Sequence, residues 1–477
     1  MKYETVIGLE VHAELATKTK IYCSCENSFG GDTNTRCCPV CIGLPGALPV
    51  LNQKVVEYGI LAGLSMHCSI ASHCKQDRKN YFYPDLPKAY QISQFDLPLC
   101  ENGYVEIDTE DGIKKIGITR IHIEEDAGKL LHAEGANFSL VDYNRGGVPL
   151  IEIVSEPDMR SPEEAMAFLE AIKSTLQAIG VSDCKMQEGS LRCDINVSVR
   201  PVGQKEFGVR SECKNVNSFH AAVRAIRFER DRQIAILESG GTVEQETRRW
   251  DDGKGESFLM RSKEESHDYR YFPEPDLMPI YVEDAWKETL SASLPELPQE
   301  KKKRYVEAYG LPKYDAGLIG ASLGLSGLFE ETVAAGAKPK TAANWLLGEI
   351  SKILNETMME AEAIPFDGAA LAELIGMIEN GTISGTIAKQ VLPEMFQSQK
   401  RPAAIVEEKG LAQISDEGAV AAIIADVLAQ NPAAVEDFKA GKEKAIGFLT
   451  GQTMRASKGK ANPGVIQKML REALEAL

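Results

Sequence analysis

The sequence has no uninterrupted apolar run of about 18 residues, the length that a helix needs to cross a bilayer. It also shows no apolar signal region, because residues 1–7 already enter a strand pattern. We therefore expect a cytoplasmic protein with no membrane association. In that reducing compartment the eleven cysteines are expected to be free thiols or metal ligands, and not a disulfide framework.

Motifs of several common catalysts are also missing. No Gly-Lys pair is followed by the Ser or Thr of a P-loop. Neither the Gly-x-Ser-x-Gly elbow of hydrolases nor a Gly-Gly-Ser-Ser segment of the amidase type occurs. If ATP binds, metal ions and basic side chains must hold its phosphates, and the glycine turns at residues 30–31 and 145–147 would allow close approach. Ammonia or acyl chemistry would need another chain.

Length and charge indicate a globular protein of several domains. Its 477 residues exceed one ordinary domain, and a usual domain size of roughly 100 to 200 residues suggests two to four units. The net charge of −17 argues against a generic nucleic-acid binder. Residues 438–471 differ, because they hold eight Lys and Arg residues against Glu443 alone. This window is interpreted as a phosphate-binding surface or, alternatively, as a solvated helix end.

The pattern along the chain predicts an α+β fold with a large, mainly antiparallel sheet in a cradle domain, then an all-helical domain and a small helical tail domain. Ser161-Pro-Glu-Glu164 opens a helix to about residue 178. A second helix is predicted over about 217–239, with Phe219, Val223, Ile226, Ile234 and Leu237 pointing inward. The proposed boundaries are 1–293 for the cradle, 294–401 for the helical domain and 402–477 for the tail.

Carboxylates and histidines recur at two-residue spacing in five predicted strands. The runs are Glu10-Val-His12, His122-Ile-Glu124-Glu125-Asp126, Glu152-Ile-Val, Asp194-Ile-Asn196-Val-Ser198 and Glu212-Cys-Lys214. Residues i and i+2 of a strand point to the same face of a sheet. Strands of this kind side by side would form a floor of hard ligands suited to Mg²⁺ or Mn²⁺. The alternative is solvated charge on the exposed face of an antiparallel sheet.

Paired cysteines form the most specific local motif. Cys23 and Cys25 are followed by Cys38 and Cys41, the latter two in a Cys-Pro-Val-Cys-Ile-Gly knuckle, and this spacing predicts a tetrahedral zinc site. Cys37 could replace Cys38 in the ligand set. An all-thiolate site has no open position for water, so its role would be to fix a loop.

A loop at residues 78–94 combines cations, amides and aromatic side chains. Arg78, Lys79 and Lys88 are candidates for contacts with phosphates or with a carboxylate substrate. The alternative is a surface loop whose aromatic residues anchor it to the core.

These segments together resemble a known family, the B subunits of aspartyl/glutamyl-tRNA(Asn/Gln) amidotransferases. The resemblance covers essentially the whole chain, and its motifs, such as Cys-Pro-Val-Cys-Ile-Gly-Leu-Pro-Gly-Ala-Leu-Pro-Val-Leu-Asn at residues 38–52, are long enough to be specific. The other matching segments are residues 3–15, 78–94, 124–129, 142–147, 154–158, 268–277 and 447–463.

The resemblance implies a ligase that forms carbon–nitrogen bonds with glutamine as amido donor. In such a heterotrimer an amidase-type A subunit releases ammonia from glutamine, and a small C subunit straps the complex. The B subunit uses ATP to phosphorylate the side-chain carboxylate of misacylated Asp-tRNA(Asn) or Glu-tRNA(Gln). Channelled ammonia then displaces the phosphate, giving Asn-tRNA(Asn) or Gln-tRNA(Gln). The missing amidase motif fits this division of labour.

The resemblance also implies site residues. The Mg²⁺ of the kinase reaction would be held by Glu10, His12 and Glu125, with Glu152, Asp194 and Glu212 as further candidates. Charge in the transition state would be offset by Lys79, Lys88 or Arg192, and ATP-binding side chains would include Arg192 and Arg145. The tail residues expected at the tRNA are Lys442, Lys444, Arg455, Lys458 and Lys460. Zinc is expected on the four cysteines.

Two other functions fit parts of the pattern. A stand-alone metal-dependent phosphohydrolase or nuclease could use the same acidic floor, and it would hydrolyse phosphate esters without tRNA or ATP. A non-catalytic tRNA-binding scaffold would keep tRNA binding when the acidic floor is altered.

Overall fold

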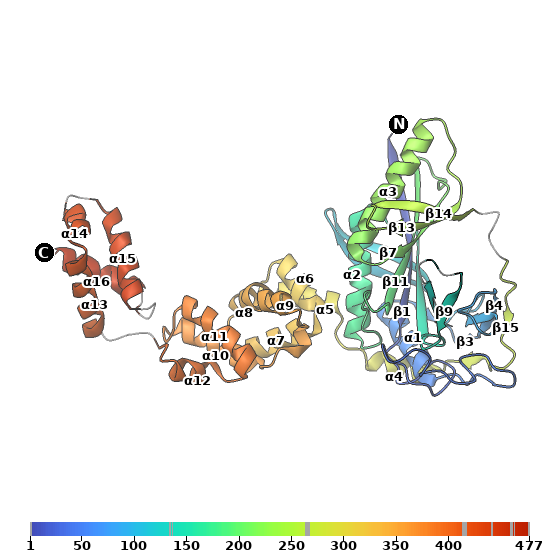
Figure 1. Cartoon of the computed structure of the whole chain (residues 1–477), viewed down its shortest axis with the longest axis horizontal. Coiled ribbons are helices and arrows are strands. Elements are labelled where there is room, and N and C mark those ends of the chain that lie inside the picture. The colour runs from blue at the N-terminus through green and yellow to red at the C-terminus, as the bar shows by residue number, and fades with distance from the viewer. Residues whose placement is uncertain are drawn as a thin grey trace. The chain divides into compact units, whose positions relative to one another are not determined.

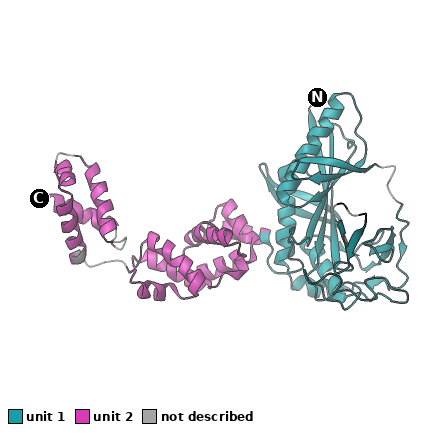
Figure 2. Ribbon diagram, viewed as in Figure 1, with its two compact units in different colours: residues 1–298 teal, residues 299–477 magenta. Residues whose placement is uncertain are grey.

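A computed structural model of the chain describes residues 2–132, 135, 137–262, 268–412, 417–439, 442–457, 461 and 463–475. The chain divides into two compact units, Met1–Pro298 and Gln299–Leu477 (Figures 1 and 2). The first unit contains the sheets, and the second consists of helices. The predicted α+β class is therefore confirmed.

The first unit is built on a nine-stranded sheet whose neighbouring strands are antiparallel, except for one parallel pair, β12 with β13. In spatial order its strands are β14 (Glu256–Ser262), β13 (Glu246–Asp251), β12 (Ser211–Val216), β11 (Leu191–Pro201), β1 (Tyr3–Glu14), β10 (Pro149–Ser155), β7 (Gly112–Glu125), β6 (Cys100–Thr109) and β2 (Ser69–Ile70). Strand β1 lies in the middle of this sheet, between β10 and β11.

The two faces of the sheet differ in chemistry because polar and apolar residues alternate along β1. Ile7, Leu9 and Val11 are buried in the main hydrophobic cluster, whereas Glu10 and His12 point to the opposite face. Three helices cover the apolar face and contribute to the same cluster. They are α1 (Gln53–Ser65), α2 (Pro162–Ala178) and α3 (Phe219–Glu238). The polar face therefore remains available for chemistry.

Both helices predicted in this unit are present. Helix α2 begins where the sequence indicates, and Ser161 Oγ accepts a hydrogen bond from the backbone N–H of Glu164 (3.1 Å). The predicted inward face of α3 is confirmed only in part, because Ile226 is buried and Phe219 packs against the core, whereas Val223, Ile234 and Leu237 are half-buried. Its buried face instead combines small residues with two polar ones, Glu229 and Gln233. Apolar periodicity could not find a face that is held partly by hydrogen bonds and ion pairs.

Smaller strands border the main sheet. They form a three-stranded sheet of β15 (Phe272–Pro273), β4 (Asp77–Asn80) and β5 (Tyr90–Ser93), and the pairs β16 (Ile280–Tyr281) with β3 (His73–Cys74) and β8 (Lys129–His132) with β9 (Ser139–Asp142). Helix α4 (Asp284–Ala292) packs against α1.

The second unit has two separate hydrophobic clusters. The first draws on residues 305–406 and the second on residues 420–474. Its elements are α5 (Pro298–Tyr309), α6 (Lys313–Ala321), α7 (Leu323–Ala334), α8 (Pro339–Trp345), η2 (Leu346–Ile350), α9 (Ser351–Thr357), η3 (Ala361–Ala363), α10 (Gly368–Glu379), α11 (Gly385–Ser398), α12 (Pro402–Glu408), α13 (Glu417–Gln430), α14 (Pro432–Lys439), α15 (Lys444–Ala456) and α16 (Pro463–Glu475). The separate boundary at residue 401 stays a prediction. Within the described part of the chain, no helix has the length and apolar content needed to span a bilayer.

Candidate active site

The polar face of the main sheet carries a continuous row of acidic and imidazole side chains. In the strand register His12 lies opposite Glu152 of β10, and Glu152 in turn lies opposite His122 of β7. On the other side of β1, Glu10 lies opposite Asp194 of β11. The two-residue spacing seen in the sequence thus becomes one row across five neighbouring strands, β7, β10, β1, β11 and β12.

The first group of potential ligands, the His12 cluster, consists of His12, Glu124 and Glu152, whose ligand atoms all lie within 4.8 Å of one another. His12 Nε2 is 3.2 Å from Glu152 Oε2 and 3.6 Å from Glu124 Oε1. His122 Nε2 lies behind them, 3.5 Å from Glu152 Oε2. These contacts place two buried carboxylates and an imidazole around one point.

Electrostatics in the His12 cluster favour positive charge. Burial alone would lower the pKa of His12, but Glu152 and Glu124 raise it to about 9. Burial would raise the pKa of Glu152, but His122, His12 and Lys79 hold it well below its ordinary value. The carboxylates therefore stay ionised, as the ligands of a hard cation must be.

The second group, the Glu212 cluster, consists of Glu10, Asp194 and Glu212, again with ligand atoms within 4.8 Å. Lys214 Nζ bridges two of them, at 2.5 Å from Asp194 Oδ2 and 2.9 Å from Glu212 Oε1. Burial and then the charges of Glu152 and Glu212 raise the pKa of Glu10. The three carboxylates repel one another unless a cation lies between them, and Lys214 partly fulfils that role.

Hydrogen bonds orient the carboxylates of the Glu212 cluster. Asn196 Nδ2 donates to Glu10 Oε1 (3.0 Å), and Thr247 Oγ1 of β13 donates to Glu212 Oε2 (2.8 Å). The two clusters share strand β1, because Glu10 and His12 are two residues apart on it.

The structure does not bring Glu125 together with Glu10 and His12, where the sequence analysis expects it. Glu124 occupies that place, because adjacent residues of β7 point to opposite faces. Glu125 instead accepts a hydrogen bond from the backbone N–H of Ile92 (2.9 Å) and pairs with Lys88, which is thereby also drawn away from the two clusters. The signal was present in the sequence, since Glu124 and not Glu125 is in phase with His122.

The predicted cations lie in different environments. Lys79 of β4 is half-buried, and although burial would lower its pKa, Glu124 and neighbouring tyrosines raise it. Arg192 Nη2 is 2.8 Å from Asp126 Oδ2, and Arg145 Nε is 3.4 Å from the same oxygen. Arg192 Nε is buried without a hydrogen-bond partner among the described residues. Lys79 and Arg192 thus flank the row of ligands.

Arg78, the third cation of the loop, is already paired. Its guanidinium makes two hydrogen bonds to the buried Glu274, at 2.6 and 2.8 Å. This bidentate contact links β4 to the segment after β15 and favours a structural role for Arg78.

The four paired cysteines converge. The sulfur atoms of Cys23, Cys25, Cys38 and Cys41 lie within 4.8 Å of one another, and we call these residues the cysteine cluster. Cys37 lies apart from this group, because its thiol donates to the carbonyl oxygen of Asn34 (3.1 Å). A hydrogen bond from Cys23, aided by the nearby charge of Lys20, lowers the pKa of Cys41 to about 5.

A buried lysine connects the cysteine cluster to the rest of the cradle. Lys20 is fully buried, and its Nζ lies 3.8 Å from Cys41 Sγ and donates to the carbonyl oxygen of Gly146 (2.7 Å). A cavity of about 140 Å³ lies between the cysteine cluster and the pair of Lys88 with Glu125. The cysteine loop therefore forms one wall of this cavity.

The basic window of the tail is only partly described. Lys442, Lys444 and Arg455 are exposed, and Lys442 Nζ is 2.8 Å from Asp437 Oδ1. Lys458 and Lys460 lie outside the described residues.

Comparison with known proteins gives consistent matches over nearly the whole chain. A family model described as the GatB/GatE catalytic domain matches residues 5–288, and one described as the GatB domain matches residues 327–474. A Caldicellulosiruptor bescii protein, named as the B subunit of aspartyl/glutamyl-tRNA(Asn/Gln) amidotransferase, is 60% identical over 480 residues, covering 100% of both chains. A protein of the same name from Thermoanaerobacter pseudethanolicus is 60% identical, and the match covers 99% of this chain and 100% of that protein. Another from Carboxydothermus hydrogenoformans is 55% identical, and the match covers 100% of this chain and 100% of that protein.

Proposed function

The chain belongs to the GatB/GatE family, among the B subunits of aspartyl/glutamyl-tRNA(Asn/Gln) amidotransferases, and we propose that its cradle phosphorylates the side-chain carboxylate of a misacylated tRNA with ATP. The enzyme is a glutamine-dependent ligase that forms a carbon–nitrogen bond. The observation that carries the kinase assignment is the pair of acidic clusters, which share strand β1 on one face of the sheet.

The donor atoms of both clusters fit Mg²⁺. They are carboxylate oxygens with one imidazole nitrogen, and hard cations of this size prefer such ligands. We infer that His12, Glu124 and Glu152 hold one ion and that Glu10, Asp194 and Glu212 hold another. Bound Mg²⁺ would neutralise phosphate oxygens of ATP.

The protein's own residues have positioning and electrostatic roles in this reaction. The tRNA-borne carboxylate attacks the γ-phosphorus of ATP, the bond to the β,γ-bridging oxygen breaks, and ADP leaves. No side-chain nucleophile is needed, and Lys79 and Arg192 would offset charge on the transferred group. Ammonia then adds to the acyl carbon and expels phosphate, giving Asn-tRNA(Asn) or Gln-tRNA(Gln).

We propose three further assignments. Glutamine hydrolysis belongs to an amidase-type A subunit, and a small C subunit completes the heterotrimer. The cysteine cluster holds a structural zinc ion, because four converging thiolates leave no open coordination position. The basic window of the tail contacts tRNA phosphates through Lys442, Lys444 and Arg455.

Reconstitution with A and C subunits tests this function. With glutamine and ATP, phosphate release should require the misacylated tRNA and should match amidated product one to one. Correctly charged tRNA serves as the control. Metal-dependent hydrolysis of phosphate esters by the chain alone, without tRNA or ATP, would instead favour a phosphohydrolase. Retained amidation after Glu152→Gln would remove the clusters from the mechanism and favour a binding scaffold.

A further inference from the structure

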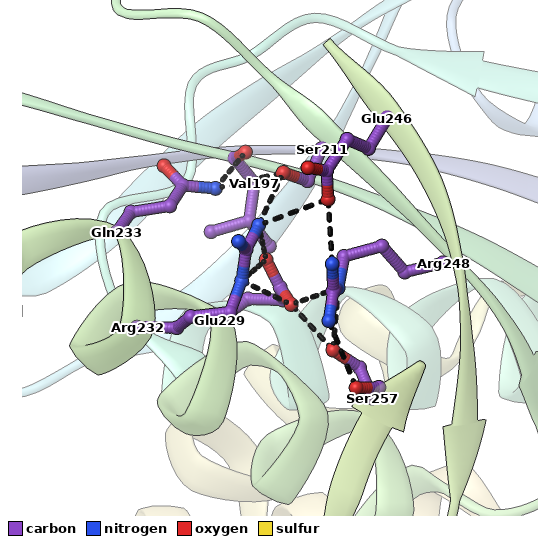
Figure 3. Close-up of polar contacts among 8 residues, drawn as sticks. All are labelled: Val197, Ser211, Glu229, Arg232, Gln233, Glu246, Arg248 and Ser257. Atoms are coloured by element: carbon purple, nitrogen blue, oxygen red, sulfur yellow. Dashed lines mark hydrogen bonds and ion pairs between the residues drawn. The ribbon is translucent and has the colours of Figure 1, made fainter. Parts of the chain in front are cut away.

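A buried carboxylate of α3 has no part in the two acidic clusters. Glu229 is fully buried on the apolar side of the sheet, where Ser257 Oγ donates to its Oε1 (2.6 Å) and Arg248 Nε lies 3.0 Å from the same oxygen. Arg232 Nη2 donates to its Oε2 (3.0 Å). Figure 3 shows Glu229 between the two guanidinium groups. The carboxylate therefore uses both oxygens.

The contacts extend from Glu229 to four strands. Arg248 Nη1 pairs with Glu246 Oε2 (2.5 Å), and Arg232 Nη2 donates to Ser211 Oγ (3.2 Å). We call the side chains of Glu229, Arg232, Gln233, Glu246, Arg248, Ser211 and Ser257 the Glu229 network. Its two carboxylates balance its two guanidinium groups. It joins α3 to β12, β13 and β14, and Gln233 Nε2 reaches the carbonyl oxygen of Val197 on β11 (3.0 Å).

The same strands carry part of the Glu212 cluster on their other face. Ser211 belongs to the network, whereas the next residue, Glu212, points to the polar side. On β13, Glu246 and Arg248 belong to the network, whereas Thr247 between them donates to Glu212 Oε2 (2.8 Å). Glu212 lies opposite Thr247 in the strand register. Whatever fixes the register of β12 and β13 therefore also fixes Glu212.

Apolar packing sets the register of these two strands only in part, through the buried Cys213, Val216 and Trp250. Each is six residues long, they pair in parallel, and register irregularities occur on both sides, in β11 with β12 and in β13 with β14. Elsewhere in a sheet the apolar pattern specifies register, because a slip by one residue turns every side chain to the other face. On the covered side of β12 and β13, charged and hydroxyl groups take several of the usual apolar positions. The ion pairs of the Glu229 network favour one arrangement of these strands, since a slip would leave buried charges unpaired.

We propose that Glu229 is a positioning residue for the Glu212 cluster: through Arg248, Ser257 and Arg232 it holds β12 and β13 in the register that presents Glu212 to Glu10 and Asp194. This inference rests on the proposed function, which assigns a bound cation to the Glu212 cluster. Glu229 itself touches neither substrate nor metal.

The test measures binding of Mn²⁺ alone to the full-length chain by electron paramagnetic resonance. Glu212→Gln identifies the signal of the Glu212 cluster, and Glu152→Gln identifies that of the His12 cluster. Glu229→Gln should weaken Mn²⁺ binding at the Glu212 cluster by about tenfold or more, as loss of a residue that supports a ligand typically does. Binding at the His12 cluster should change by less than about twofold, because its side chains lie on β1, β7 and β10.

Two further variants separate positioning from general destabilisation. Ile172 lies on α2, in the same hydrophobic core, and its side chain is not part of the Glu229 network, so Ile172→Ala opens a cavity in that core without touching the network. It should leave both Mn²⁺ affinities unchanged. If Glu229→Gln does not fold, Ser257→Ala replaces it, and a selective loss of about threefold or more at the Glu212 cluster is expected, since one network hydrogen bond is removed.

The outcomes are distinct. Suppose that Glu212→Gln lowers the Mn²⁺ affinity of the Glu212 cluster. The positioning role is then overturned if that affinity is unchanged in a folded Glu229→Gln variant, or in Ser257→Ala where that variant is used instead. Equal losses in Ile172→Ala and Glu229→Gln overturn it as well. If Glu212→Gln alone leaves Mn²⁺ binding as in the unaltered chain, no cation binds at the Glu212 cluster and the positioning role of Glu229 is overturned. If Glu152→Gln also leaves it unchanged, both proposed cation sites fail and the proposed function fails with them.

Discussion

At the scale of single residues, the choice between Glu124 and Glu125 decides where a cation can bind. Glu124 faces His12 and Glu152, whereas Glu125 faces Ile92 and Lys88 on the other side of β7. Glu124→Gln should weaken Mn²⁺ binding to the full-length chain by about tenfold or more, because it removes an ionised ligand. Glu125→Gln is the matched control, and its Mn²⁺ affinity should stay within about twofold of the unaltered chain. The opposite ranking in a Mn²⁺ titration would contradict the proposed ligand set.

Glu14 gives a prediction about pH. Burial and the charge of Asp126 raise its pKa to about 8 in the folded chain, well above its value in an unfolded one. A carboxyl of this kind binds its proton more tightly when folded, so its contribution to stability is present at low pH and is lost as pH rises from about 4.5 to 8. Glu14→Gln should therefore raise the melting temperature relative to the unaltered chain by roughly 2–4 °C at pH 8.5, and by less at pH 5. A difference that does not grow with pH, in paired thermal melts across this range, would be inconsistent with the raised pKa.

At the scale of elements, the cysteine loop is expected to depend on its metal. Cys25→Ser should lower bound zinc from one ion per chain to none, as measured by atomic absorption. Because metal binding is coupled to folding of the loop, we expect the melting temperature to fall by roughly 5 °C or more. Cys37→Ser is the control, since its thiol bonds to Asn34 outside the cysteine cluster. Loss of zinc in Cys37→Ser with retention in Cys25→Ser would reverse the ligand assignment.

Element type was more predictable than the direction of individual side chains. The strands with acidic residues at two-residue spacing and helix α2 follow from alternation and from an N-cap, which are local features. The choice of Glu125 over Glu124 neglected that same alternation. The burial of Glu229 on α3 could not be predicted, because its partners other than Arg232 come from β13 and β14.

Among the cysteines, spacing predicted the group of four but not its membership. Cys37 and Cys38 are adjacent, and the sequence does not show which one turns toward Cys41. The backbone supplies the answer, since the N–H of Cys38 donates to Cys41 Sγ (3.0 Å).

At the scale of the whole molecule, an acidic protein binds an acidic ligand, so tRNA binding should depend on its few basic surfaces. The double variant Lys442→Ala with Lys444→Ala should weaken tRNA binding by the complete enzyme. It should also reduce the slope of log affinity against log salt by about 1 to 2, because each phosphate contact contributes about 0.9. The control is Lys340→Ala in α8, which is also exposed but lies outside the basic window. An unchanged slope in filter-binding assays would place the tRNA contacts elsewhere.

The position of Glu10 and His12 on one strand also limits how the family can vary over evolution. Each cluster takes one ligand from β1, and the two are separated by Val11 alone. A single-residue insertion or deletion between them would turn one of the two ligands into the hydrophobic core, so their two-residue spacing must be kept for both clusters to keep their ligands. The hairpin tip between β6 and β7, where Thr109 pairs with Gly112, has no such constraint. Length changes among functional relatives should therefore occur at that tip and be absent from residues 8–14.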